Sequence, residues 1–379
     1  MAKLELIATA TFGLEAVVKR EIEALGYKIL KTENGKIIYL GDERALVRSN
    51  LWLRSADRVL VRIGEFTAVS FEELFQQIKA LPWEQWIPLD GKFTVIGTSV
   101  KSTLHSVPDC QAIVKKAIVE KLKETYPVDQ FPETGADYTV KVTLLKDQVT
   151  ITLDSSGPGL HKRGYRIQDV AAPIKETLAA AMVQLSFWKA GRLLVDPFCG
   201  SGTIPIEAAM LSRNIAPGLS RRFASEEWEA IPRELWKEER KIAYESIDYT
   251  KKVHIQASDI SLSAIKAAKE NAEEAGVDDC IHFSVMPVRS FKAKEDYGII
   301  ITNPPYGERI GEKEDIHKIY RDLMMFMNEN PTWSLYLVTS DKEFEQLFMN
   351  KPADRRRKLY NGRIEICYYQ YYGEKPKKL

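Results

Sequence analysis

The sequence predicts an α/β protein in which a doubly wound, mostly parallel sheet with a C-terminal antiparallel hairpin follows an α+β region. From residue 175 onward, helical segments alternate with short apolar strands at 193–196, 253–257, 281–285, 298–302 and 334–339. That alternation is typical of a doubly wound sheet. Near the end of the chain, Asn361-Gly362 separates two strand-like segments, and this dipeptide favours a hairpin whose last strand is antiparallel.

The N-terminal half predicts two smaller units of strands and helices. The first has strand candidates at 4–9, 36–40 and 58–63 and a helix that ends near Gly26. The second has a helix before Pro82, a strand at 93–97, a helix around 113–122, and strands at 138–145 and 148–154 that turn at Lys146-Asp147. We therefore expect domains at 1–65 and 66–155, a linker at 156–172, and a third domain at 173–379 with an insertion at about 214–250.

The composition of the chain limits the classes of protein to which it can belong. The chain has 379 residues and a formal net charge of +1, so nucleic-acid binding would have to come from local clusters. It has no long apolar run and no signal-peptide pattern, which predicts a cytoplasmic protein without a membrane span. Four scattered cysteines and five histidines without ligand spacing predict no metal site. The oligomeric state stays open.

A glycine-rich turn follows the first strand of the C-terminal half. The apolar strand ends at Asp196, and Gly200 and Gly202 precede a helix. Two glycines let a ligand approach the backbone, and the free amides of the helix favour an electronegative group. The turn lacks the lysine of a P-loop and has Pro205 at the third glycine position of a dinucleotide fingerprint. Asp196 suits a ligand with an ammonium group, although an ordinary tight turn is the alternative.

Asp259 and Ile260 end the next strand. An acidic residue at this position commonly binds ribose hydroxyls. The distance from the glycines is longer than in dehydrogenases, which the insertion at about 214–250 explains. The alternative is that Asp259 caps the following helix ahead of Ser261.

The segment Asn303-Pro304-Pro305-Tyr306 carries the clearest chemistry. Two prolines directly after an apolar strand predict a rigid loop at the edge where open α/β sheets bind ligands. The amide oxygen of Asn303 and the main-chain oxygen of Pro304 can accept hydrogen bonds from an amine attached to a nucleobase, and so localise its lone pair. Tyr306 offers a flat face, worth about 1–3 kcal/mol if a base stacks on it. The loop therefore predicts chemistry on an exocyclic amine.

Three motifs in order carry a family resemblance: D-P-F-C-G-S-G-T, then S-D-I, then T-N-P-P-Y-G-E-R. The chain resembles class I methyltransferases of the RlmL-like group, which modify the N2 amine of guanine in ribosomal RNA and were formerly labelled N6-adenine-specific DNA methylases. The resemblance extends to residues 1–155, which are similar to a ferredoxin-like domain followed by a THUMP domain. It implies a Rossmann-like fold and S-adenosyl-L-methionine as cofactor.

The resemblance also implies site residues. We expect Asn303, Pro304, Pro305 and Tyr306 to act at the target base. The residues expected at the methyl donor are Pro173, Lys175, Glu176, Asp196, Phe198, Gly200, Ser201, Gly202, Thr203, Asp259, Ile260 and Asn303. For Pro173, Lys175 and Glu176, the alternative is that they simply form an ordinary helix start. The family often has an acidic residue where this chain has Pro287, so the contact to the donor's adenine is unassigned.

RNA contacts are expected from cations near the expected site. Lys162, Arg163 and Arg166 lie beside the domain junction, and Arg309 follows Tyr306 closely. A solvated linker is the alternative for the first three. The cluster 355–358 fits a solvated strand edge that discourages strand pairing.

The sequence thus predicts methylation of the guanine N2 amine in 23S ribosomal RNA. N6-adenine methylation of RNA or DNA, guanine methylation of transfer RNA, methylation of a protein glutamine, and a non-catalytic RNA-binding assembly factor are the alternatives. A THUMP-like module favours RNA, and the intact Asn303–Tyr306 segment favours an enzyme.

Overall fold

The structure, a computed structural model, describes residues 3–168, 173–305, 312–348 and 352–375. It divides into two compact units. The first contains Met1–Ala10, Val18–Leu160 and Arg222–Ile242, and the second contains Thr11–Val17, His161–Arg221 and Ala243–Leu379. The domain limits expected from the sequence stay a prediction.

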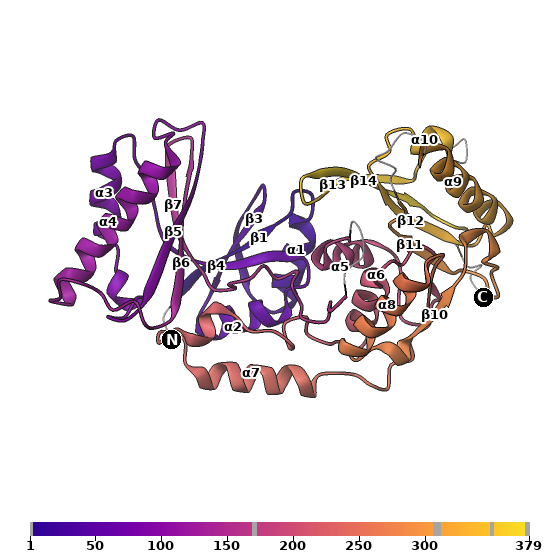
Figure 1. Ribbon diagram of the computed structural model, residues 1–379, viewed down its shortest axis with the longest axis horizontal. Coiled ribbons are helices and arrows are strands. Elements are labelled where there is room, and N and C mark those ends of the chain that lie inside the picture. The colour runs from indigo at the N-terminus through magenta and orange to yellow at the C-terminus, as the bar shows by residue number, and fades with distance from the viewer. Residues whose placement is uncertain (1–2, 169–172, 306–311, 349–351, 376–379) are drawn as a thin grey trace. The chain divides into compact units, whose positions relative to one another are not determined.

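A seven-stranded sheet forms the first unit, in the order β2-β3-β1-β4-β7-β6-β5 within the described residues (Figure 1). The long strand β4 pairs with β1 on one side and with β7 on the other. The strands are β1 (Leu4–Ala10), β2 (Lys28–Glu33), β3 (Lys36–Gly41), β4 (Ala56–Thr67), β5 (Lys92–Val100), β6 (Asp137–Leu145) and β7 (Gln148–Asp154). The helices are α1 (Glu15–Ala24), α2 (Glu43–Trp52), α3 (Phe71–Lys79) and α4 (Val107–Thr125).

The turn between β6 and β7 confirms the predicted hairpin. Lys146 and Asp147 both have positive φ, 52° and 65°. Two successive residues of this kind match the twist of the flanking strands. No sequence signal predicts β2 or the parallel pairing between β5 and β6, which are separated in the chain by α4.

The segment 222–242, part of the predicted insertion, packs in the core of this first unit. Its Trp228 ring stacks on Tyr138 with ring centroids 5.1 Å apart, and the indole N–H donates to the main-chain oxygen of Asp137 over 3.1 Å. In the helix α7 (Arg233–Glu245), Glu239 accepts a hydrogen bond from Arg44 over 2.6 Å. A segment that interrupts the C-terminal half in sequence therefore completes the N-terminal unit.

The second unit confirms the doubly wound sheet and its antiparallel hairpin. Within the described residues the strand order is β10-β9-β8-β11-β12-β14-β13, and the first five strands are parallel (Figure 1). β14 is antiparallel to β12 and to β13, and Gly362 turns the hairpin with φ 65°. The strands are β8 (Leu194–Asp196), β9 (Ile255–Asp259), β10 (Ile281–Val285), β11 (Ile299–Thr302), β12 (Ser334–Thr339), β13 (Arg355–Asn361) and β14 (Ile364–Tyr371).

Helices cover both faces of this sheet. The helices α5 (Glu176–Leu185), α6 (Thr203–Ser212) and α8 (Leu262–Glu274) share one apolar cluster with the strands, whereas α9 (Glu312–Glu329) and α10 (Phe344–Leu347) share another. Among the described helices, none has a stretch that is long and apolar enough to cross a membrane.

Candidate functional site

The strand order places a switch point between β8 and β11. From β8 the chain moves outward through β9 to β10, and it then returns to the other side of β8 at β11. Ligands of open α/β sheets bind beyond the carboxyl ends of the strands at such a point. The turn after Asp196 and the loop that begins at Asn303 follow these two strands directly.

The glycine turn is built by local backbone conformation and close packing. Gly200 and Gly202 have φ of 52° and 84°, in the left-handed region that favours glycine. A Cβ atom at Gly202 would lie 3.1 Å from the Cβ atom of Ala268 in α8. The N–H of Cys199 also donates to the main-chain oxygen of Ser258 in β9 over 3.0 Å. The turn is therefore held between α8 and the end of β9.

Asp196 is 1% exposed at the end of β8. Its Oδ1 accepts hydrogen bonds from the hydroxyl of Thr302 over 2.7 Å and from the N–H of Phe198 over 3.2 Å. Burial raises the pKa of its carboxyl to about 7, although both hydrogen bonds oppose that rise. A buried carboxyl of this kind gains from a cationic ligand, which stabilises its ionised form.

Asp259 holds the other side of the turn. Its Oδ2 accepts from the N–H of Gly200 over 3.1 Å, and its Oδ1 accepts from the N–H of Ser261 over 2.9 Å. The cap of α8 is Ser261, whose side chain accepts from the N–H of Ala264, so the alternative that Asp259 is itself the cap is wrong. The neighbouring Ile260 is 75% exposed, which leaves an apolar surface beside the carboxylate.

The loop after β11 begins at a fixed point. Thr302 is fully buried, and its hydroxyl donates to Asp196, so the ends of β8 and β11 are joined by a side-chain hydrogen bond. Asn303 is half-buried, Pro304 is buried and Pro305 is exposed. Tyr306 and Arg309 lie outside the described residues. Thr302 is the first residue of the T-N-P-P-Y-G-E-R motif, but sequence reasoning gave it no role.

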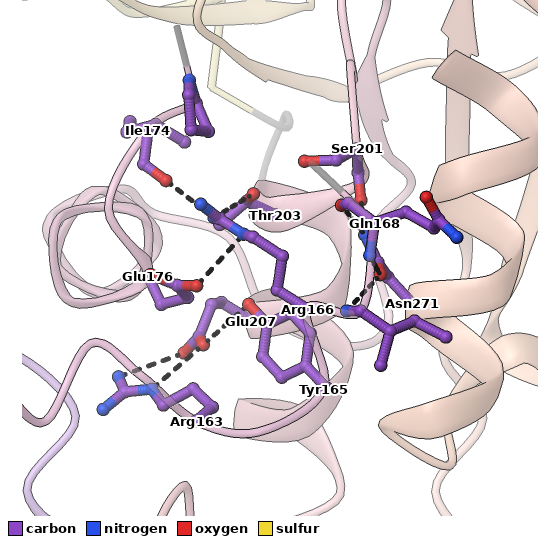
Figure 2. Close-up of polar contacts among 12 residues, drawn as sticks. Arg163, Tyr165, Arg166, Gln168, Ile174, Glu176, Ser201, Thr203, Glu207 and Asn271 are labelled. Atoms are coloured by element: carbon purple, nitrogen blue, oxygen red, sulfur yellow. Dashed lines mark hydrogen bonds and ion pairs between the residues drawn. The ribbon is translucent and has the colours of Figure 1, made fainter. Parts of the chain in front are cut away.

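The start of α5 is tied to the start of α6 by Arg166 (Figure 2). Its guanidinium donates to the main-chain oxygen of Ile174 and to the hydroxyl of Thr203, each over 2.9 Å, and pairs with Glu176 at 3.1 Å. Burial raises the pKa of Glu176 against the attraction of Arg166. Lys175 is the residue that precedes the first turn of α5. Glu176 and Thr203 are both expected at the methyl donor. They are therefore brought together by Arg166, which the sequence predicts as an RNA contact.

Arg163 has a buried partner. Its side chain is 2% exposed and binds the fully buried Glu207 of α6 at 3.2 Å, and Glu207 also accepts from the hydroxyl of Tyr165 over 3.1 Å (Figure 2). This arrangement gives Arg163 and Arg166 packing roles that the sequence pattern did not predict. RNA contacts by these two residues and by Lys162 stay a prediction.

Asn271 of α8 links the same segment to the glycine turn. It is fully buried, its Oδ1 accepts from the N–H groups of Ile167 and Gln168, and its Nδ2 donates to the main-chain oxygens of Gln168 and Ser201. Figure 2 shows this side chain between the two segments. No sequence signal marks Asn271, because an asparagine within a helix is usually solvated.

The segment after β10 begins with a main-chain contact to β9. The N–H of Met286 donates to the main-chain oxygen of Asp259 over 2.9 Å, and Pro287 follows with extended backbone. The contact to the donor's adenine therefore stays unassigned.

Family models match the whole series of domains. Residues 163–370 match the RMKL-like methyltransferase domain, residues 5–60 the RlmL ferredoxin-like domain, and residues 68–154 the THUMP domain. A protein of Bacillus subtilis (strain 168) with the name "Putative RNA methyltransferase YpsC" is 53% identical over 376 residues, which cover 99% of this chain and 97% of that relative.

Two further relatives extend the similarity. "Ribosomal RNA large subunit methyltransferase K/L" of Psychromonas ingrahamii is 33% identical over 97% of this chain, and the match spans 50% of its length. The crystal structure of SMU.472 complexed with SAH is 42% identical, with a TM-score of 0.93 over 100% of both chains. With these matches over nearly its full length, the chain belongs to the THUMP-containing, RlmL-like methyltransferase family.

Proposed function

We propose that the chain transfers a methyl group from S-adenosyl-L-methionine to the exocyclic N2 amine of a guanine in 23S ribosomal RNA. The observation that carries this proposal is the hydrogen bond from Thr302 to Asp196. It joins the strand that ends in the expected acceptor loop to the strand that ends in the glycine turn. The relatives' names, which include a ribosomal RNA methyltransferase, and the SAH-bound relative support the substrate and the cofactor.

The described residues fit this methyl donor. The donor supplies an electrophilic methyl group on a sulfonium. Asp196 offers a buried carboxyl that a cationic ligand would ionise, and Asp259 offers a carboxylate at the tip of β9 for ribose hydroxyls. Gly200 and Gly202 bring main chain close to the ligand without side-chain atoms.

The acceptor side needs hydrogen-bond acceptors rather than a base. The lone pair of an exocyclic amine is delocalised into its ring, so the amine is a weak nucleophile. The side-chain oxygen of Asn303 and the main-chain oxygen of Pro304 would accept hydrogen bonds from its two N–H groups and localise that lone pair towards the methyl group. As the N–C bond forms, the C–S bond breaks, S-adenosyl-L-homocysteine leaves, and the methylated amine loses one proton to solvent. The two prolines hold both acceptors in place. Because the sulfonium is already a strong electrophile, correct positioning contributes most of the remaining rate enhancement. Extruding the guanine from its helix costs a few kcal/mol, which stacking on Tyr306 offsets.

The test uses a labelled methyl donor with unmodified ribosomal RNA, transfer RNA and duplex DNA in separate reactions. Nucleoside analysis of the products should find label in ribosomal RNA as N2-methylguanosine. Label as N6-methyladenosine, or transfer confined to transfer RNA, DNA or protein, would overturn the substrate. No transfer to any of them, with donor bound, would favour the assembly factor.

A further inference from the structure

The tip of the β13–β14 hairpin projects past the sheet on the side where ligands bind. In the pairing register, Thr339 at the end of β12 lies opposite Cys367, and Cys367 lies opposite Lys358. Because β13 runs parallel to β12, the three residues Leu359, Tyr360 and Asn361 continue beyond the carboxyl end of β12. This is the edge at which the glycine turn and the Asn303 loop also lie.

Contacts connect this tip to the donor side of the site. The amide of Asn361 donates to the main-chain oxygen of Pro173 over 3.5 Å. The next residue, Ile174, accepts from Arg166, which also binds Thr203 at the start of α6. A short series of contacts therefore runs from the hairpin tip to the glycine turn, all within the second unit.

An aromatic pair lies at this tip. The ring of Phe12 meets the edge of Tyr360 with centroids 6.2 Å apart and an interplanar angle of 74°, and Phe12 remains 49% exposed. Phe12 belongs to Thr11–Val17, the part of the N-terminal sequence that folds with the second unit. A Cβ atom at Gly13 would lie 2.7 Å from the main-chain oxygen of Lys358, and Gly13 has φ of 91°, so this glycine lets the segment lie directly on β13.

The same hairpin is strongly cationic. Residues 355–365 include five Lys and Arg residues and one carboxylate. Lys358 is 54% exposed, pairs with that carboxylate, Glu365, at 2.6 Å, and lies over the Tyr360 ring at 5.6 Å. Arg356 pairs with Glu345 at 2.9 Å, while Arg355 and Arg363 are exposed at opposite ends of the strand and turn. The local charge is therefore positive although the whole chain is nearly neutral.

An exposed ring, Phe12, beside the half-buried Tyr360 and surrounded by cations matches the chemistry of a single-stranded nucleic acid. Bases stack on aromatic side chains, and phosphates bind the surrounding Lys and Arg residues. An exposed apolar pair without such cations would fit a protein partner equally well, but the positive charge favours a polyanion.

We propose that Phe12, Tyr360 and the cations of residues 355–363, here called the hairpin platform, bind an unpaired RNA segment that flanks the target nucleotide. This inference rests on the proposed function for the identity of the target. The platform stacks one or two bases on the Phe12 ring and the accessible part of Tyr360. Arg363 at the tip binds one phosphate, and Arg355, opposite Gln370 at the other end of β13, binds another farther along the RNA. It positions RNA and takes no part in the methyl transfer.

The chain offers a matched control for the aromatic pair. Phe187 is 59% exposed, and its ring lies 5.1 Å from Tyr372. Tyr372 directly follows Tyr371, which lies opposite Leu335 near the amino end of β12, so this second pair lies at the edge away from the site. Lys266 and Lys269 on the exposed side of α8 are the matched cations.

The experiment measures binding of a labelled, unstructured RNA oligonucleotide of about 16 nucleotides to the full chain at several salt concentrations. Phe12→Ala with Tyr360→Ala should weaken binding by about tenfold or more, whereas Phe187→Ala should not. Tyr360→Phe alone should retain affinity, because the ring remains. Arg355→Gln with Arg363→Gln should lower the slope of log affinity against log salt by about 1.4, and Lys266→Gln with Lys269→Gln should leave it unchanged.

Donor affinity and the kinetics of methyl transfer separate this proposal from the proposed function. The aromatic variant should bind S-adenosyl-L-methionine as the wild type does, and should raise the KM for RNA with little change in kcat. Wild-type RNA affinity in both the aromatic and the cationic variants would overturn the platform even if methylation proceeds. If wild type fails to methylate RNA but these variants still lose RNA binding, the proposed function fails and the platform stands.

Discussion

At the scale of single residues, the buried carboxyl of Asp196 lowers the stability of the folded chain near neutral pH and, in the proposed reaction, also serves to bind the ligand. Its carboxyl is 1% exposed, and its pKa of about 7 compares with an ordinary value of 3.8. The folded chain therefore holds this proton more tightly than the unfolded chain does. As pH rises from about 4 to about 7, the unfolded state releases the proton first, and the folded state loses stability. Above about pH 7 both states are ionised, and the loss is complete.

Asp196→Asn should remove this pH-dependent loss. We expect the variant without ligand to gain stability over the wild type at about pH 8 and to differ little at about pH 4, as measured by urea unfolding. Its affinity for the methyl donor should fall, because the ionised carboxyl is absent. Thr302→Val should instead destabilise the folded chain, since it removes a hydrogen bond that lowers the pKa of Asp196. Equal pH profiles for Asp196→Asn and wild type would contradict this account.

At the scale of elements, the segment before α5 depends on a buried ion pair. Arg163→Ala would leave Glu207 buried without its cation, and we expect a loss of about 3–5 kcal/mol in the free energy of unfolding. The double variant Arg163→Met, Glu207→Gln keeps the shape without charge and should recover most of that stability. If Arg163→Ala weakened RNA binding while stability stayed at the wild-type value, the packing role would be wrong and the RNA contact expected from the sequence would gain support.

An element or a site residue could be predicted where its sequence signal comes from neighbouring residues in the chain. The glycine turn, the strand that ends at Asp259, and the Asn361-Gly362 and Lys146-Asp147 hairpins each depend on neighbouring residues, and all appear at the predicted places. Thr302, Asn271 and the pairing of Arg163 with Glu207 depend on residues brought together by the fold. A single sequence gives no sign of such distances. For the same reason Arg163 and Arg166 looked like solvent-facing cations.

At the scale of the whole molecule, the segment 222–242 makes the stability of the first unit depend on sequence within the C-terminal half. Trp228 is 1% exposed and stacks on Tyr138. Trp228→Ala should destabilise the first unit by about 3–5 kcal/mol and leave the second nearly unchanged.

Donor added at about 100 times its Kd should stabilise the second unit alone, by about 2.7 kcal/mol. Hydrogen exchange read separately over the two units would check both, and equal loss of protection in β8–β12 would contradict the assignment of this segment.

In the proposed reaction, the loop after β11 receives the amine while the turn after β8 holds the donor. The most direct test is to measure donor affinity and single-turnover methyl transfer for Asn303→Ala on ribosomal RNA. We predict a donor Kd raised by no more than about fivefold, because Asn303 is also expected at the donor, and a rate of transfer at saturating donor lowered by about a hundredfold or more. A variant that transfers the methyl group at the wild-type rate would contradict the claim.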